Sequence, residues 1–386
     1  MKKDNSRLKI LFLIESLSGG GAEKVLVTLL KHLDKTRFDA TLCCVSNVGP
    51  FIEDVRLNTS YRYLLPDPSN LSGLPLLFYK IKHHLIYSWL PAAWCYRLFI
   101  PKGNDVEVAF TEGFVTRLLS FSTNKISKKI AWVHIDLESN PWTQQKGVFK
   151  DLEEECACYS RFDRIACVSE SVAVVFKRLY KPSVPVSVLY NPIDYDTVVS
   201  QSKELVSLPQ KMRFRIVSIG RLAPQKAFDR LLAIAGKLQR EGFNFDLWIL
   251  GEGEQRNYLK QIAFREGLKD IVTFWGFKDN PYPYIAASDL FVCSSLAEGF
   301  STAATEALIF GVPVVTTECA GMRELFGNYE CGIIVDNDKD ALYEGLKTVL
   351  ADKDLYDKYK LNAEKRAEDF NLSSTIEPIQ DFLEGC

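Results

Sequence analysis

The sequence predicts an α/β protein of two domains, each with a parallel sheet covered by helices on both faces. Its 386 residues suggest two domains, because one domain typically has about 100–200 residues. Short apolar strands alternate with amphipathic helices in both halves, and short connections between such elements favour parallel pairing. Polar loops follow several strands, at the edge where open α/β sheets bind ligands. Two such domains in tandem imply a cleft between them.

Composition and charge exclude several classes of protein. Hydrophobic residues make up 47% of the chain and charged residues 25%, as in ordinary soluble enzymes. A net charge of −2 argues against a nucleic-acid partner. The ten cysteines are scattered without zinc-site spacing, so reduced thiols in a cytoplasmic protein are expected. The apolar run Ile10–Ile14 is too short for a signal peptide, and no segment reaches the length of a transmembrane helix.

The first half begins with a predicted strand at Leu8–Ile14, a glycine-rich loop at 18–21 and a helix at Ala22–Leu33. The glycines allow backbone to approach a bound phosphate, although a tight turn alone explains them as well. Further strands are predicted at Thr41–Val45, Val106–Phe110, Lys129–His134 and Arg164–Val168. His134 therefore ends a strand, and a single histidine is more often structural than catalytic.

Residues 74–100 have an irregular pattern and are rich in aromatic and basic side chains. These are Phe78, Tyr79, Tyr87, Trp89, Trp94, Tyr96 and Phe99, interleaved with Lys80, Lys82, His83, His84, Arg97 and Lys102. Ordinary helices packed on the sheet are one interpretation. The other is a surface in the lipid interface, where both kinds of side chain are favourable. On that interpretation residues 79–102 contact a membrane, and the protein is peripheral on the inner face of the cell membrane.

The second half is expected to follow a polar linker at Asp196–Lys211 and to alternate strands with helices. The strands are predicted at Arg215–Ile219, Asp246–Leu250, Ile271–Trp275, Leu290–Ser294 and Val312–Thr317. The helices are predicted at Lys226–Gln239, Glu254–Arg265, Tyr282–Ala287 and Thr302–Phe310. This alternation predicts a second parallel sheet.

Two glutamates mark a candidate ligand site in the second half. Glu298 lies in the loop after a strand, and Glu306 lies inside the next helix, which Ser301 is expected to cap. A solvated surface charge is the commoner role for a single glutamate. A carboxylate pair beside a helix N-terminus, however, suits a ligand with both hydroxyls and phosphates, such as a nucleotide-sugar.

Three motifs resemble the retaining GT-B glycosyltransferases of family GT4. Glu298 and Glu306 form E-x7-E, Arg221 and Lys226 form GR-x4-K, and residues 20–23 form GGxE. The resemblance covers nearly the whole chain and implies two Rossmann-like domains with parallel sheets facing an interdomain cleft. The implied parts are an acceptor-binding domain at 1–192, a nucleotide-sugar-binding domain at 193–365, and a C-terminal helix at 366–386 that crosses back to the first domain.

The resemblance also implies an activity and an acceptor. A hexosyl or N-acetylhexosaminyl unit would pass from a nucleoside diphosphate sugar, expected to be UDP-linked, to a hydroxyl of a glycan or lipid-linked acceptor in surface polysaccharide synthesis. The anomeric configuration would be retained. No residue is an obvious nucleophile, so double displacement and front-face attack both remain open.

The same resemblance assigns roles to individual residues. Arg221 and Lys226 would stabilise the diphosphate, and Glu306 would bind the ribose. Glu298 would orient the sugar, and His134 would lie against it. The other implied donor-binding residues are Gly20, Gly21, Gly251, Gly253, Phe277, Gly299, Phe300 and Ser301.

Two features depart from this pattern. Asp336 and Asp338 form D-x-D, which is typical of the metal site of GT-A glycosyltransferases and could hold Mg²⁺ or Mn²⁺. Asp338 as the N-cap of the following helix is the favoured interpretation, so no divalent metal and no other cofactor is expected. Ala227 stands where many family members have glycine, which can alter the shape of that loop.

Two other functions remain open from the sequence. A nucleotide-sugar 2-epimerase has the same fold and a similar donor site, but it reacts with the donor alone. A non-catalytic sugar-nucleotide binder is disfavoured, because Arg221, Lys226, Glu298 and Glu306 are all present together.

Overall fold

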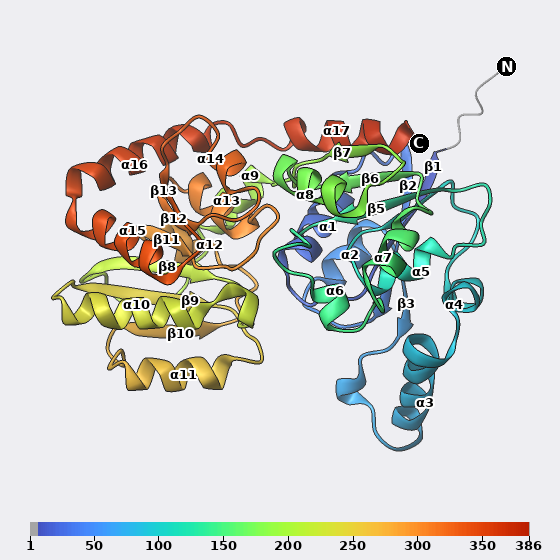
Figure 1. Cartoon of the computed structure of the whole chain (residues 1–386), viewed down its shortest axis with the longest axis horizontal. Helices are drawn as coiled ribbons and strands as arrows, with labels where there is room; N and C mark the ends of the chain where they lie inside the picture. The colour runs from blue at the N-terminus through green and yellow to red at the C-terminus, as the bar shows by residue number, and fades with distance from the viewer. Residues whose placement is uncertain (1–6, 386) are drawn as a thin grey trace. The chain divides into compact units, whose positions relative to one another are not determined.

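The computed structural model describes residues 7–385 and divides the chain into two compact units (Figure 1). The first unit consists of Met1–Pro192 together with Ser373–Cys386, and the second of Ile193–Leu372. Each unit has its own parallel sheet. The chain returns to its first unit through the last helix, α17 (Ser373–Glu384).

Helix α17 is attached to the first unit mainly by its apolar face. Ile379 and Leu383 are fully buried, although Pro378 lies inside the helix. The side chain of Gln380 accepts a hydrogen bond from the Asp34 amide at 2.7 Å. Burial of such apolar side chains contributes more than surface ion pairs do, so the apolar face holds the helix in place.

Within the described residues, the first unit holds a seven-stranded parallel sheet in the order β3-β2-β1-β4-β5-β6-β7. The strands are β1 (Leu8–Ile14), β2 (Phe38–Ser46), β3 (Ser60–Leu65), β4 (Val106–Ala109), β5 (Lys128–Val133), β6 (Arg164–Cys167) and β7 (Val186–Val188). The strand order reverses between β1 and β4. The loops after these two strands diverge and leave room for a ligand at the carboxyl edge of the sheet.

The central strands confirm the sequence prediction, and the bounds of β1 agree residue for residue. The edge strands β3 and β7 were not predicted. β3 exposes Ser60, Arg62 and Tyr63, and β7 has only three half-buried residues, so neither carries a long apolar run. An edge strand lacks a neighbour on one side and therefore shows a weaker apolar pattern.

Helices cover both faces of this sheet (Figure 1). They are α1 (Gly21–His32), α2 (Ile52–Asn58), α3 (Gly73–His84), α4 (Ala92–Phe99), α5 (Phe114–Ser120), α6 (Trp142–Gln145), α7 (Leu152–Tyr159) and α8 (Glu170–Tyr180). A short 3₁₀ turn at Pro68–Asn70 precedes α3, and the π-helix η2 (Leu85–Trp89) lies between α3 and α4. Helix α1 buries Val25, Leu26, Leu29 and Leu30, which belong to its predicted apolar stripe.

The aromatic and basic region therefore folds into helices, and only part of it packs on the sheet. Helix α4 buries Cys95 and Tyr96, and the Tyr96 hydroxyl donates to the buried Glu107 of β4 at 2.7 Å. Helix α3 has no buried residue, and Figure 1 shows it beyond the end of β3, at the opposite end of the unit from α17. Packing on the sheet explains α4 but leaves the apolar side chains of α3 exposed. These are Leu74, Leu77, Phe78 and Ile81.

The second unit holds a six-stranded parallel sheet, again within the part of the chain that the structure describes, in the order β10-β9-β8-β11-β12-β13. The strands are β8 (Phe214–Ile219), β9 (Phe245–Leu250), β10 (Val272–Gly276), β11 (Leu290–Cys293), β12 (Val314–Thr317) and β13 (Gly332–Val335). The order reverses between β8 and β11, and open α/β sheets commonly bind ligands at such a reversal.

Helices also flank the second sheet. They are α9 (Tyr195–Gln201), α10 (Phe228–Arg240), α11 (Arg256–Arg265), α12 (Tyr282–Ala286), α13 (Thr302–Ile309), α14 (Met322–Phe326), α15 (Lys339–Ala351) and α16 (Lys353–Ala367), with a 3₁₀ turn at Pro224–Lys226. In residues 7–385, no helix combines the length and the apolar character needed to cross a bilayer.

Two sequence predictions in this unit are wrong in detail. The expected linker Asp196–Lys211 begins inside helix α9, because Asp194 caps that helix and Val198 is buried. Helix α10 begins at Phe228 rather than at Lys226, because Ala227 takes a left-handed conformation that separates it from the preceding 3₁₀ turn.

Candidate active site

Two loops meet at the reversal point of the second sheet. Residues 220–227 follow β8, and residues 294–301 follow β11. Lys226 Nζ lies 2.5 Å from Glu298 Oε1, which also accepts a hydrogen bond from Ser295 Oγ at 2.5 Å. The structure therefore brings together a lysine and a carboxylate that are 72 residues apart in the sequence.

The Lys226–Glu298 pair is largely withdrawn from water. Its side chains are 23% and 9% exposed. Burial opposes the charge on Lys226, but the ion pair with Glu298 outweighs this effect and raises the pKa of the lysine. The loop consequently holds a charged lysine, paired with Glu298, in surroundings of low dielectric, where electrostatic interactions are strong.

The loop of 220–227 also carries Arg221 and Ala227. The Arg221 side chain is exposed. Ala227 has φ 47° and ψ 44°, a conformation that costs a non-glycine residue about 1–2 kcal/mol. The chain thus turns sharply between the 3₁₀ turn that ends at Lys226 and helix α10, even though no glycine is present at this position.

Gly251 and Gly253 are needed for close contact between two backbone segments. A Cβ atom on Gly251 would lie 2.0 Å from the Gly220 carbonyl oxygen, and one on Gly253 would lie 2.4 Å from that of Leu222. The loop after β9 therefore lies directly against the loop that carries Arg221 and Lys226. The close approach of the two backbones requires these glycines whether or not they contact the donor. Their contact with the donor stays a prediction.

Helix α13 begins beside Glu298. The Ser301 hydroxyl accepts a hydrogen bond from the Ala304 amide at 3.3 Å, so the predicted N-cap is confirmed. Glu306 is buried within the helix, and Phe277 is partly exposed after β10. Gly299 and Phe300 lie in the loop between Glu298 and the cap. The structure collects most of the predicted donor-binding residues at one edge of the sheet.

Arg230 was not predicted, yet it organises this edge. Its guanidinium donates to the carbonyl oxygens of Ser294 and Ser295 at 2.8 Å each, and to Asn337 Oδ1 at 2.9 Å. It therefore connects helix α10 with the loops after β11 and β13. The sequence signal that could have identified Arg230 was the presence of a basic residue between the buried Phe228 and Leu231 of an amphipathic helix.

The D-x-D segment has a structural role. Asp338 Oδ1 accepts from the amides of Asp340 and Ala341 at 2.8 Å each, so the predicted N-cap of α15 is confirmed. The side-chain amide of Asn337 donates from Nδ2 to the Leu296 carbonyl oxygen at 2.8 Å. Among residues 7–385 there is no group of three or more His, Cys, Asp or Glu side chains placed to hold a metal ion.

A second candidate site lies at the carboxyl edge of the first sheet. Glu112 follows β4, is 5% exposed, and accepts hydrogen bonds from the amides of His134 and, at 3.0 Å, Ile135. Burial raises the pKa of Glu112 to about 7, although these backbone amides oppose the shift. Glu112 was not predicted, and its position directly after an apolar strand was the signal that could have found it.

His134 is held next to Glu112 in a neutral state. Burial lowers the pKa of its imidazole to about 3, with a hydrogen bond that the ring donates to the Phe110 backbone opposing the shift. The ring centroid lies 4.9 Å from that of Phe110, and the side chain is half-buried. The buried Nε2 atom has no hydrogen-bond partner within the described residues. An unpaired buried nitrogen is costly unless a ligand satisfies it.

The aromatic region reaches this same edge through Tyr87. Its hydroxyl donates to Glu15 Oε1, directly after β1, at 3.0 Å, and its ring lies 4.4 Å from that of Phe114. Burial raises the pKa of Glu15, and the Tyr87 hydrogen bond opposes this shift. In the GGxE turn, a Cβ atom on Gly20 would lie 2.3 Å from a carboxylate oxygen of Glu23. Polar groups from several elements therefore converge at the end of β1.

Two family models match the chain and together cover most of it. Residues 19–197 match the model described as Glycosyltransferase Family 4, and residues 201–366 match the model described as Glycosyl transferases group 1. Each match falls almost entirely within one of the two units.

Two curated relatives have defined activities in their names. N-acetylgalactosamine-N,N'-diacetylbacillosaminyl-diphospho-undecaprenol 4-alpha-N-acetylgalactosaminyltransferase of Campylobacter jejuni is 36% identical over 200 residues, which span 51% of this chain and about half, 53%, of the relative. UDP-Gal:alpha-D-GlcNAc-diphosphoundecaprenol alpha-1,3-galactosyltransferase of Escherichia coli is 26% identical over 99% of this chain and 98% of its own length.

Solved structures agree with the fold. Anabaena HepE, in complex with UDP-glucose, superposes with a TM-score of 0.75 at 20% identity over 98% of this chain and 100% of its own. Sucrose-phosphate synthase from Thermosynechococcus elongatus gives a TM-score of 0.77 at 16% identity, over 98% of this chain and 99% of its own. At such identities the likeness concerns the fold alone.

Proposed function

Because this chain belongs to the family 4 glycosyltransferases of the GT-B fold, we propose that it transfers a hexosyl or N-acetylhexosaminyl unit from a UDP-sugar to a hydroxyl of a lipid-linked glycan. The observation that carries the proposal is the Lys226–Glu298 ion pair at 2.5 Å, beside the capped N-terminus of α13. A fixed cation, a carboxylate and a helix N-terminus suit a ligand with phosphates and hydroxyls.

The donor is assigned to the second unit. Arg221 and Lys226 stabilise the diphosphate, Glu298 orients the sugar together with the backbone of residues 299–300, and Glu306 binds the ribose. The name of the E. coli relative specifies UDP-Gal, and that relative aligns with nearly the whole chain, which supports a UDP-linked donor. The leaving diphosphate gains negative charge in the transition state, and fixed cations can stabilise it without a divalent metal.

The acceptor is assigned to the first unit. His134, which is expected to lie against the donor sugar, is neutral, and its Nε2 is unpaired within the described residues. Together with the buried carboxyl of Glu112 it provides polar groups without a fixed positive charge. Such groups suit the hydroxyls of a sugar. The names of both relatives specify acceptors linked to diphospho-undecaprenol, which supports a lipid-linked acceptor.

A lipid-linked acceptor would also explain why helices α3 and α4 of the first unit expose aromatic side chains. Phe78 on α3 is 67% exposed and Trp94 on α4 is 55% exposed, and Tyr87 connects this region to Glu15 at the edge of the sheet. Exposed aromatic and basic side chains are stabilised at a lipid interface. Membrane contact through residues 79–102 would place the lipid of the acceptor beside the acceptor-binding edge.

The membrane contact is tested by sedimentation with vesicles. We expect the full chain to pellet with vesicles that contain anionic lipid and less so as salt increases. Phe78→Ser combined with Trp94→Ser should weaken the binding, whereas Phe264→Ser, an exposed phenylalanine of α11, should not. Pelleting that is absent, or indifferent to lipid charge and to these substitutions, would contradict the contact.

The activity is tested with donor and acceptor supplied separately. A panel of nucleotide-sugars in a thermal-shift assay identifies the donor, and a short-chain polyprenyl diphosphate glycan then serves as acceptor. We expect a UDP-sugar to raise Tm and a glycosylated product to form only when the acceptor is present. Conversion of the donor without an acceptor would favour the epimerase instead, an alternative that the transferase relatives do not support.

A further inference from the structure

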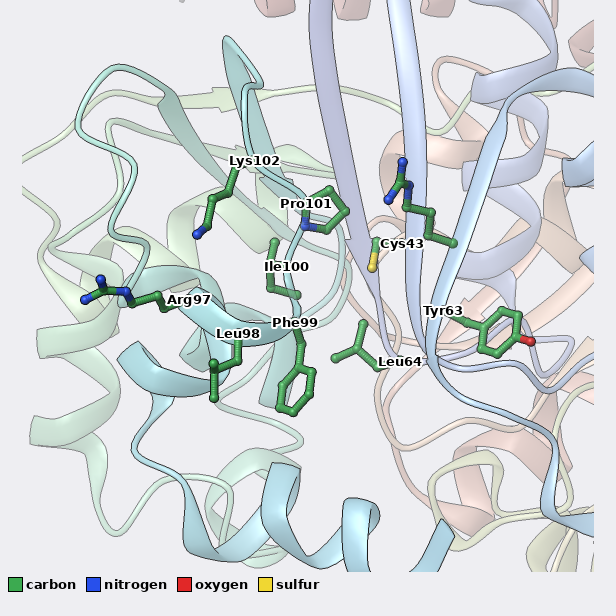
Figure 2. Close-up of a pocket in the computed structure, with 10 residues that line it drawn as sticks. Cys43, Tyr63, Leu64, Arg97, Leu98, Phe99, Ile100, Pro101 and Lys102 are labelled. Carbon is green, nitrogen blue, oxygen red and sulfur yellow. The ribbon is translucent and has the colours of Figure 1, made fainter. Parts of the chain in front are cut away.

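A cavity of about 420 Å³ lies in the first unit between the outer strands of the sheet and the end of α4 (Figure 2). Cys43 of β2 and residues 62–64 of β3 line one side, and residues 97–102 line the other. The cavity has the size of a small-ligand site. No role in the proposed transfer reaction involves its residues.

Three cations line this cavity without an acidic side chain among them: Arg62, Arg97 and Lys102. In residues 7–385 none of the three forms an ion pair with a carboxylate, although Arg97 lies over the Trp94 ring at 5.9 Å. Unpaired cations around one cavity favour an anion, and guanidinium groups suit the oxygen atoms of a phosphate.

The cavity is also partly apolar, and one of its lining residues is an exposed leucine. Leu64 and Ile100 are buried in its wall. Figure 2 shows Arg97 and Lys102 on one side of the cavity and Tyr63 on the other, with Ile100, Phe99 and Leu64 between them. Leu98, next to Arg97 on α4, is 59% exposed. A ligand with a phosphate and an adjoining apolar part matches this arrangement.

The cavity is tied to helix α3 by Lys82. The Lys82 ammonium donates to the Leu64 carbonyl oxygen at 2.7 Å and lies 5.4 Å from the centre of the Phe99 ring. One side chain of α3 therefore contacts both walls. On the other side, α4 is anchored through Tyr96 to the buried Glu107. The cavity is consequently a built part of the helical region rather than a gap between loose side chains.

We propose that this cavity binds the phosphate monoester headgroup of an anionic membrane lipid, which the cations of its two walls, Arg62 on one side and Arg97 and Lys102 on the other, attract. The proposal rests on the proposed membrane contact and names the headgroup that directs it. The cavity is separate from the acceptor hydroxyl, because Lys102 precedes β4 whereas Glu112 follows it. The exposed Leu98 in the lining, and the exposed apolar side chains of α3, which Lys82 connects to the cavity, favour a lipid over a free phosphate in solution.

The test compares lipids at equal surface charge, because a diffuse basic surface responds only to that charge. Phosphatidylcholine vesicles containing phosphatidic acid or phosphatidylserine are adjusted to the same zeta potential, and binding of the full chain is measured by sedimentation. The cavity variant is R62Q/R97Q/K102Q. The control variant K125Q/K146Q/K177Q removes the same charge from exposed lysines of the first unit that lie outside the cavity.

We expect wild type and the control variant to bind the phosphatidic acid vesicles on the order of tenfold more tightly than the phosphatidylserine vesicles. The cavity variant should lose this preference while it keeps the donor-induced rise in Tm and transfer to a water-soluble acceptor. Those two measurements show that it is folded and separate a failure of the cavity proposal from a failure of the proposed reaction.

Equal binding of wild type to both vesicles, or no binding to either, would overturn the proposal. So would a control variant that loses the preference to the same extent as the cavity variant. Soluble glycerol 3-phosphate provides the last comparison. A rise in Tm with this compound that depends on the three cations, without any preference among vesicles, would assign the cavity to a soluble phosphate and contradict the lipid.

Discussion

At the reversal point of the second sheet, Lys226 and Glu298 form an ion pair, whereas the corresponding edge of the first sheet holds Glu112 and His134 without such a pair. Burial shifts the pKa of Glu112 up to about 7 and that of His134 down to about 3, so both favour the neutral form. Burying an isolated charge is costly, and pairing reduces the cost. The second sheet thus keeps a charged pair, which suits the proposed diphosphate, and the first keeps groups that suit hydroxyls and proton transfer.

Among the tests of this difference between the two sheets, Lys226→Ala is expected to have the largest effect. We expect a loss of about 2–4 kcal/mol of transition-state stabilisation, roughly 30- to 900-fold in kcat, because the leaving diphosphate loses its fixed cation and Glu298 stays buried without its ion-pair partner. Steady-state transfer assays measure the effect. Lys260→Ala, which removes an exposed lysine of α11, should leave kcat unchanged.

The same assay with EDTA separates fixed cations from a metal. Wild type should remain active in EDTA, and Asp336→Ala should remain active as well. Loss of activity in EDTA that Mn²⁺ restores and that Asp336→Ala reproduces would make D-x-D the centre that stabilises the diphosphate.

His134→Ala tests the other side of the comparison. We expect kcat to fall by on the order of 10²-fold while UDP affinity changes little, because the nucleotide is assigned to the second unit and His134 to the first. Single-turnover kinetics and calorimetric titration with UDP measure the two quantities. Equal losses in kcat and UDP affinity would show that His134 acts on the bound nucleotide or on the structure as a whole.

Glu112→Gln sharpens the comparison through pH. The pKa of Glu112 is raised from 4.5 to about 7 in the folded state, so wild type loses stability from this group as pH rises through that window. Glutamine cannot ionise. The free energy of unfolding of the variant should therefore improve relative to wild type by about 3 kcal/mol between about pH 4.5 and pH 8.

Denaturant titrations of both proteins at these two pH values measure the difference. The pKa of His134 is lowered to about 3, so its contribution is lost as pH falls from 6.5, but this change is common to both proteins and cancels. A difference between variant and wild type that does not change with pH would show that the pKa of Glu112 is not raised in the folded state.

The smallest expected effect concerns the strain at Ala227. Ala227→Gly should raise the free energy of unfolding by about 0.5–1 kcal/mol, because glycine adopts φ 47° without the steric cost that alanine pays, partly offset by the entropy of the unfolded chain. Ala233→Gly, in the middle of α10, should lower it by about 1 kcal/mol. Thermal unfolding of both variants decides whether the turn stores strain; destabilisation by both substitutions would show that it does not.

Local sequence patterns were sufficient to predict a structural feature when that feature depended on a single helix or strand. The bounds of β1 and the caps at Ser301 and Asp338 were predicted from the residues and are confirmed. A buried central strand must be apolar, and a cap depends on one side chain and the next few amides. Where the pattern depended on a neighbouring strand, as it does for the edge strand β3, the sequence alone did not predict the element.

The sequence by itself determined the fold class, the order of the central strands and helices along the chain, and the loops that carry Arg221, Lys226 and Glu298, because these depend on periodicity and on residues close in the chain. Only the tertiary structure decided that Lys226 and Glu298 pair across 72 residues, that Glu112 binds the backbone at His134, and that α3 leaves its apolar side chains exposed. Contacts across the sheet and degrees of burial arise from packing between distant segments, and no local pattern specifies which partners meet or how much water they retain.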